Sequence, residues 1–279
     1  MIRPVAVALV LSCFAASASA QAQPAPGTAA TPATKPAAKK QSPTTKATAK
    51  PSGEAQNGPC QLGVIPAVGD QLVVQKVGFT VFGNEDAEVP IGSWGLDDLV
   101  VTRVRAAVAP GIAVRRIAYA KEALTSLEQS KGLLFRDTKA ELISLVRQIA
   151  SGANCQRYVL VSRFIGQFSN TNQNVRGVGI VKWDHPLKKQ TYLYALTYIR
   201  VFDGQDFSII KQGAASTNDE SLVSRALMLA PVRGPNRELD EASFPAAPAG
   251  AATNPAFRDG VRALLTTSLD KTLPALLAP

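Results

Sequence analysis

The sequence predicts an α+β or α/β domain, built on one mixed β-sheet with about three helices packed on it. Stretches 94–109, 137–150 and 255–277 carry apolar residues at three-to-four spacing, which is typical of amphipathic helices. Short β-branched and aromatic runs lie between them, and Asp203-Gly204 separates two such runs as in a β-hairpin. This order of strands and helices favours a sheet covered by helices.

The N-terminal residues are typical of an exported protein. Arg3 precedes the apolar stretch Val5–Ala16, and Ser17-Ala18-Ser19-Ala20 supplies small residues for cleavage. This is the pattern of a secretory signal peptide over residues 1–20, with cleavage after Ala20. The apolar stretch is shorter than the roughly 20 residues that span a bilayer. We therefore expect a bacterial periplasmic or secreted protein.

Cys13 leaves two interpretations of this processing. Val10-Leu11-Ser12-Cys13 resembles a bacterial lipobox, and lipidation of Cys13 would anchor the protein to the outer membrane. Alternatively, Cys13 is a chance cysteine within the hydrophobic run. Contact with a membrane is expected only under the first interpretation.

Residues 21–59 predict a disordered tether. They consist mainly of Ala, Pro, Thr and Lys, so they bury too little apolar surface to offset the entropy of ordering. As polyproline II, the tether would reach on the order of 100 Å. Residues 1–59 contain six of the 30 Lys and Arg and one of the 21 Asp and Glu, which leaves residues 60–279 at about +4. This modest charge argues against a nucleic-acid-binding domain.

Residues 60–279 have the size of one domain, in which Cys60 and Cys155 predict a disulfide. Each cysteine stands just before a predicted strand, and two neighbouring parallel strands would bring these starts together. Exported proteins form such bridges readily. The alternative is a pair of free buried thiols.

The individual elements follow from local signals. Ser93 is expected to cap the helix from Trp94, and Pro110-Gly111 to end it. The last helix is expected to run from Pro255 to Leu277, whereas the Pro-, Ala- and Gly-rich stretch 231–254 predicts an irregular loop. The remaining predicted elements are strands at 62–66, 71–77, 79–82, 112–119, 158–168, 176–183, 192–202 and 207–214, with a short helix at 121–129.

The order of elements resembles the small α/β domain of the CsgG-like and LpoB-like bacterial envelope lipoproteins and the N-terminal domain of TolB. The amphipathic helix Leu96–Val108, the strand opening at Arg157-Tyr158-Val159-Leu160 and the Asn254-Pro255 step carry this resemblance. The opening Gly63-Val64-Ile65-Pro66 departs from the usual "VAVLPF"-type run of that family. The resemblance implies an accessory or assembly role.

No catalytic or cofactor motif stands out. His185 is the single histidine, and Asp184 beside it cannot readily orient its imidazole, so we expect a turn residue after a strand. No second histidine is present for a zinc site. We therefore expect no enzymatic activity, no cofactor and no metal.

Two surfaces are candidate contacts. Tyr192, Tyr194 and Tyr198 recur at period two, followed by Arg200, and such residues suit contact with a glycan or a protein. The alternative is a row of core aromatics beneath a helix. The loop Ser169–Asn174 offers the amides of three asparagines to a polar ligand, or is an ordinary exposed loop. Those three asparagines are Asn170, Asn172 and Asn174.

Three functions remain open from the sequence. The first is a non-enzymatic periplasmic accessory or assembly protein that binds an envelope protein or a cell-wall polymer. The second is a carrier of a small ligand, with its pocket between the sheet and the C-terminal helix. The third is a hydrolase whose site the sequence does not reveal.

Overall fold

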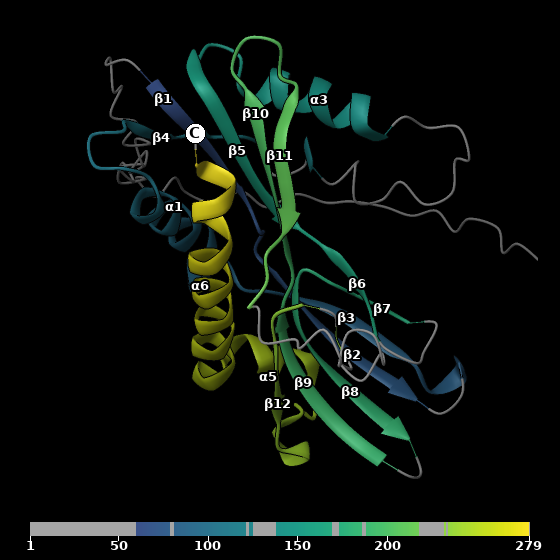
Figure 1. Cartoon of the computed structure of the whole chain (residues 1–279). Helices are drawn as coiled ribbons and strands as arrows, with labels where there is room; N and C mark the ends of the chain where they lie inside the picture. The colour runs from purple at the N-terminus through teal and green to yellow at the C-terminus, as the bar shows by residue number, and fades with distance from the viewer. Residues whose placement is uncertain are drawn as a thin grey trace, which may run out of the picture. The chain divides into compact units, whose positions relative to one another are not determined.

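A computed structural model of the full chain describes residues 60–78, 81–120, 123–124, 138–168, 173–185, 188–217, 232 and 234–278 (Figure 1). These residues belong to one compact unit, Glu54–Pro279. Several predictions lie outside the described residues: the signal peptide 1–20, the tether 21–59, Cys13, Asn170, Asn172 and most of the helix at 121–129.

The α+β class is confirmed, and the described strands form two five-stranded mixed sheets where one was predicted. The first sheet has the order β11-β10-β5-β1-β4, the second β12-β9-β8-β2-β3, and β6 and β7 make a separate ribbon. The strands are β1 Cys60–Ala67, β2 Gln71–Gly78, β3 Glu85–Pro90, β4 Val114–Arg116, β5 Cys155–Arg163, β6 Ile165–Gln167, β7 Asn174–Arg176, β8 Val178–His185, β9 Lys188–Ala195, β10 Thr197–Asp203, β11 Ile209–Ala214 and β12 Asn236–Leu239.

Three chain segments contribute strands to both sheets, and each segment is interrupted where it passes from one sheet to the other. Strand β1 continues into β2, β5 leads through the β6–β7 ribbon into β8, and β9 continues into β10. The strands of the first two segments pair in parallel, β1 with β5 in the first sheet and β2 with β8 in the second. The strands of the third segment pair antiparallel, β10 with β5 in the first sheet and β9 with β8 in the second. The same three-strand order therefore runs through both sheets.

Backbone hydrogen bonds hold the breaks together. The N–H of Leu196 donates to the carbonyl of Gly177 at 2.7 Å, and the N–H of Phe164 donates to the carbonyl of Leu196 at 3.1 Å. Gly69 and Gly177 lie at φ +87° and +59°, which side chains rarely adopt. The continuous strand predicted at 192–202 was wrong at Leu196, because the chain changes sheets there.

The helices cover both faces of the first sheet (Figure 1). Helices α1 and α6 pack on the face that presents Val64, Val159 and Ile199, whereas α3 packs on the face that presents Ile65, Leu160 and Phe202. This alternation follows from the period of two along each strand. The described helices are α1 Leu96–Ala107, α3 Thr138–Ile149, α5 Pro248–Thr253 and α6 Pro255–Leu277, with short 3-10 turns at Val81–Gly83, Gly92–Trp94 and Glu241–Ser243.

Two helix starts differ in how well the sequence anticipated them. Helix α6 begins where expected, and the side chain of Asn254 accepts a hydrogen bond from the N–H of Ala256 at 2.9 Å. Helix α1 begins at Leu96 with Gly95 in the N-cap position at φ +61°. Ser93, predicted as the cap, lies in the preceding 3-10 turn.

The irregular loop predicted at 231–254 was wrong. It contains β12 and α5. Strand β12 pairs with the open edge of β9, and this partner satisfies its backbone groups. Helix α5 is tied to the domain by the indole N–H of Trp94, which donates to the carbonyl of Ala252 at 3.0 Å. Composition alone did not reveal these partners.

The predicted bridge between Cys60 and Cys155 is present. These residues are the first pair in the parallel register of β1 and β5, and their Cα atoms lie 4.5 Å apart. Both cysteines are buried in the core between the first sheet and α3. The bridge therefore ties two neighbouring strands that lie 95 residues apart in the sequence.

Candidate anion-binding cavity

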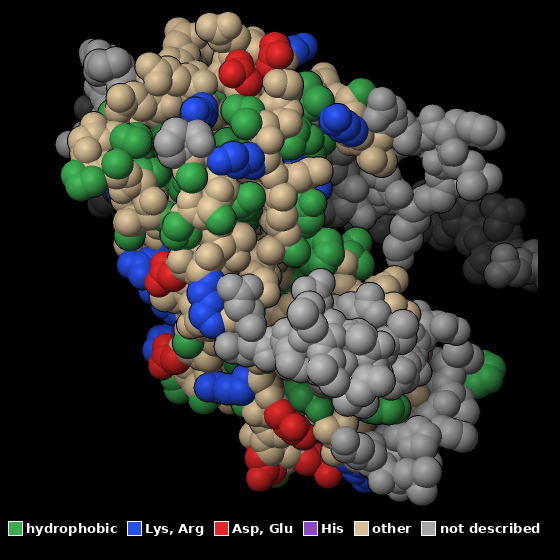
Figure 2. Space-filling model, in the orientation of Figure 1, with side chains coloured by type: hydrophobic (Ala, Val, Ile, Leu, Met, Phe, Trp, Pro, Cys, Tyr) green, Lys and Arg blue, Asp and Glu red, His purple; other side chains and the backbone are tan. Residues whose placement is uncertain are grey.

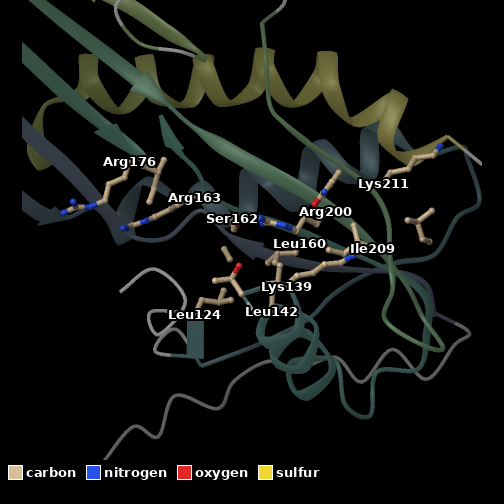
Figure 3. Close-up of a pocket in the computed structure, with 15 residues that line it drawn as sticks. Leu124, Lys139, Leu142, Leu160, Ser162, Arg163, Arg176, Arg200, Ile209 and Lys211 are labelled. Atoms are coloured by element: carbon tan, nitrogen blue, oxygen red, sulfur yellow. Dashed lines mark hydrogen bonds between the residues drawn. The ribbon is translucent and has the colours of Figure 1, made fainter. Parts of the chain in front are cut away.

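A cavity of about 530 Å³ lies between the first sheet and α3, on the face opposite α6 (Figure 3). Strands β5, β10 and β11 form one wall and the start of α3 forms the other. The described lining residues are Ala67, Leu124, Thr138, Lys139, Leu142, Leu160, Ser162, Arg163, Ile165, Arg176, Arg200, Ile209, Ile210, Lys211 and Gln212. This set combines apolar side chains with five cationic ones.

Strand register explains which residues reach the cavity. Arg200 of β10 stands opposite Leu160 of β5 and Gln212 of β11. Leu142 of α3 packs with Leu160 in the core, and Lys139 lies one helical turn before it. Figure 3 shows Arg200 and Leu160 coming from the sheet, and Lys139 and Leu142 from α3. The cavity therefore opens where the core beneath α3 ends.

Arg200 is the most distinctive residue of the lining. Its guanidinium lies over the ring of Tyr198, 4.3 Å from the ring centroid, and Nη1 donates to the hydroxyl of Ser162 at 3.4 Å. The Tyr198 ring in turn packs at a tilt against Phe164, with the centroids 5.5 Å apart. Burial lowers the pKa of Arg200, and Tyr198 partly counters this effect. Among the described residues, no carboxylate pairs with Arg200.

Arg163 and Arg176, at one end of the cavity, make structural contacts within the protein. Arg163 donates to the carbonyls of Val68 at 3.2 Å and Gln71 at 3.4 Å, across the break between β1 and β2. Arg176 pairs with Glu88 at 3.1 Å and with Asp86 at 3.4 Å. Burial lowers the pKa of Arg176, but these two carboxylates outweigh it and the net shift is upward.

Lys211 also has a structural partner. Its Nζ donates to the carbonyl of Ala278 at 2.7 Å, at the end of α6. Lys211 is opposite Val201 in the register of β11 and β10, and Val201 belongs to the core on the α6 side. The ammonium of Lys211 is thus directed away from the cavity, whereas Arg200 of the sheet and Lys139 of α3 line it from opposite walls.

The predicted tyrosine contact surface is divided by the break at Leu196. Tyr192 and Tyr194 are buried in the core of the second sheet and form no exposed contact face. Among the described residues, those packed around them, such as Val175 of β7 and Val181 of β8, come from strands and not from a helix as the core alternative expected. Burial and Glu238 raise the pKa of Tyr192 to about 12, and burial also raises the pKa of Tyr194. Tyr198 and Arg200 belong to the first sheet and are half-buried.

The other sequence candidates lie away from the cavity centre. Asn174 is exposed on β7 and pairs with Gln167, and its binding role stays a prediction. His185 is the last residue of β8. The described residues contain no group of three or more side chains arranged for a metal ion.

Sequence reasoning missed Ser162 and Lys139. Two signals were available for them. Ser162 interrupts the apolar alternation of Tyr158 and Leu160 on β5, and Lys139 shares a helix face with Leu142. Their convergence depends on how α3 packs on the sheet, which no local pattern specifies.

The charges outside the cavity are mixed. On the face that carries α6, side chains of both signs are interspersed (Figure 2). Arg103, for example, pairs across this face with Asp270 at 3.1 Å. Unlike Arg103, Arg200 has no carboxylate partner among the residues that the structure describes.

Comparisons with known proteins give only distant structural alignments. No family model and no curated protein matches the chain. The PelC dodecamer from Paraburkholderia phytofirmans aligns at 11% identity over 79% of this chain and 89% of that chain, with a TM-score of 0.31. The LpoB C-terminal domain from Salmonella enterica aligns at 11% identity over 57% and 84%, with a TM-score of 0.21. Lipoprotein GNA1162 from Neisseria meningitidis aligns at 14% identity over 61% and 93%, with a TM-score of 0.25.

The LpoB C-terminal domain, one of the proteins that the order of elements resembles, is thus among the solved structures that align with this chain. In the described part of the chain, no helix is long and apolar enough to cross a bilayer.

Proposed function

We propose that this chain is a non-enzymatic accessory protein of the bacterial cell envelope that binds another, anionic envelope component in the cavity beneath α3. The observation that carries this proposal is Arg200, a half-buried cation that lines the cavity with no carboxylate partner among the described residues. The export signal and the disulfide support an extracytoplasmic location.

A partly buried charge is costly unless an opposite charge compensates it. Removing a guanidinium from water carries a desolvation penalty, which a bound anion would offset. The stacking of Arg200 on Tyr198 and its bond to Ser162 hold the guanidinium in place before a ligand arrives. Such preorganisation lowers the entropic cost of binding.

The polar groups of the described lining suit binding better than chemistry. Lys139 and Arg200 donate hydrogen bonds and carry positive charge, and neither is a ready general base at neutral pH. Ser162 already accepts a bond from Arg200. These groups would hold and orient an anion, which is why we propose a binding protein.

Photo-crosslinking in the native envelope tests this function. A benzophenone amino acid at Ile210, which lines the cavity and is 44% exposed, is expected to capture an envelope component of discrete mass. Ile112 is a matched control, 38% exposed and outside the cavity lining. Combining the Ile210 probe with Arg200→Gln should lower the adduct yield. Identical adducts from both positions would refute binding at this cavity.

Carriage of a free small ligand is the second candidate, and the volume of the cavity favours it. About 530 Å³ lies within the range of small-molecule sites. This cavity lies on the face of the first sheet opposite α6. The sequence led us to expect a pocket between the sheet and α6, and a separate hollow of about 450 Å³ lies there, lined by Arg237 of β12 and by Gly260 and Leu264 of α6. A single metabolite released from protein purified without added ligand would favour this candidate.

A further inference from the structure

We infer that the cavity takes an amphipathic anion, with a phosphate or carboxylate head at Arg200 and an alkyl chain against Leu124, Leu142 and Leu160. This inference rests on the proposed function and names the chemistry of its ligand. It follows from the way positive charge and apolar surface are divided within the lining.

The head-group end is defined by Arg200. Guanidinium presents five N–H donors in a planar fork that matches carboxylate and phosphate oxygens. One bond of Arg200 goes to Ser162, and one face of the guanidinium is covered by Tyr198. The remaining donors suit a two-pronged contact with an anion. Lys139, on the opposite wall, adds a second positive charge to the same cavity.

The core beneath α3 forms the end of the cavity that would hold the alkyl chain. Leu124, Leu142 and Leu160 are buried members of the cluster that also contains Phe202 and Val146, and all three line the cavity. The cavity is thus an extension of the hydrophobic core. An alkyl chain there would leave water for an apolar wall, which strengthens binding roughly fourfold for each buried methylene.

The two ends of the ligand lie within reach of one another. Arg200 stands opposite Leu160 in the register of β10 and β5, so the cation and the apolar floor are neighbours on one sheet face. Inorganic phosphate would contact only the cationic end of the cavity at Arg200, and an alcohol would contact only the end lined by leucines. A molecule with both an anionic head and an alkyl chain uses the whole lining.

Calorimetric titration of the full chain with octyl phosphate, decyl phosphate, decanol and inorganic phosphate, below their micelle concentrations, tests the inference. Decyl phosphate should bind roughly fifteenfold more tightly than octyl phosphate, because two more methylenes are buried. It should also exceed decanol and inorganic phosphate by about tenfold or more, since each lacks one half of the ligand.

Variants locate the head group. Arg200→Gln should weaken decyl phosphate by about tenfold or more and leave decanol unchanged. Arg157→Gln removes one charge from an exposed residue of the same sheet outside the lining, and should leave both ligands unchanged. If Arg200→Gln fails to fold, Lys139→Gln on the exposed start of α3 provides a second loss of cavity charge, with a smaller weakening in the same direction.

Two sources of the ligand are separated by vesicles of phosphatidylglycerol. Retention of lipid by the protein after the vesicles are removed indicates a membrane lipid, whereas binding of decyl phosphate without lipid uptake indicates a free amphiphile. Both outcomes support the inference. Inorganic phosphate binding as tightly as decyl phosphate, or an Arg200→Gln variant with unchanged affinity, would overturn it. A specific adduct at Ile210 without any alkyl-anion binding would refute the ligand class and leave the proposed function standing.

Discussion

Replacing Cys60 and Cys155 by alanine removes a bridge between the first residues of β1 and β5. The two Cα atoms lie 4.5 Å apart in adjacent, parallel strands, although 95 residues separate them along the chain. The strands pair along their length without the bridge, so the native structure should persist. The expected effect of the substitutions lies chiefly in the unfolded state.

The magnitude follows from the length of the closed loop. In the chain-entropy model, opening a loop of 95 residues restores conformational entropy worth about 4.7 kcal/mol at 25 °C to the unfolded chain. Small domains are stable by about 5–15 kcal/mol, so the loss would be a large share of the total. The alanines also remove two buried sulfur atoms, which adds a smaller packing loss.

Urea unfolding of the full chain measures this loss. The double variant should unfold at a much lower urea midpoint, with a larger m-value, because its unfolded state is less compact. Each single variant, kept monomeric with reductant, should lose almost as much free energy of unfolding as the double variant. The bridge needs both sulfur atoms, so the second substitution should add only a few tenths of a kcal/mol.

Two results would refute this reasoning. A double variant that loses less than about 1 kcal/mol with an unchanged m-value would show that the bridge does not restrict the unfolded chain. Single variants whose losses simply add would show that each cysteine acts through its own packing. Reduced wild-type protein serves as the control, because it opens the bridge without changing the sequence.

Three further predictions concern other parts of the molecule. Arg163→Gln should lower the free energy of unfolding by about 2 kcal/mol in urea titrations, because two carbonyls at the β1–β2 break lose a charged donor; an unchanged midpoint would contradict this. The free energy of unfolding should fall as pH rises from about 10 towards 12, because tyrosine in the unfolded chain ionises at its ordinary pKa, whereas folded Tyr192 keeps its proton up to about pH 12. Tyr192→Phe should flatten this decline, and an equal decline in that variant would contradict the prediction. Intact mass of the native protein should show a chain starting at Gln21 with one disulfide, whereas an acylated Cys13 would show lipoprotein processing.

Much of the fold could be predicted because its signals are local. The helical spacing over Pro255–Leu277 predicted both bounds of α6, since this pattern depends on neighbours within one or two turns. The β1–β5 bridge was also predictable, because a parallel pair of strands aligns their starts. The resemblance to envelope domains was drawn from the order of elements and carried no information about a cavity.

The candidate site could be predicted only in part. Arg200 was singled out for its place after a row of tyrosines, yet Tyr192 and Tyr194 proved to lie in the other sheet. The period of two fixes which residues share a face only while the strand is continuous. At Leu196 the chain passes from β9 to β10, so the pattern before that residue says nothing about the face after it.

The sequence by itself determined the class of fold, the long C-terminal helix and the cysteine pair, and it predicts an export signal at residues 1–20. Tertiary structure alone decided that the strands form two sheets and that the edge of β9 recruits β12. It also brought Lys139 of α3 and Arg200 of β10 to opposite walls of one cavity. The physical reason is range: caps, turns and periodicity act between residues a few positions apart, whereas strand partners and cavity walls come from segments tens of residues apart that only packing brings together.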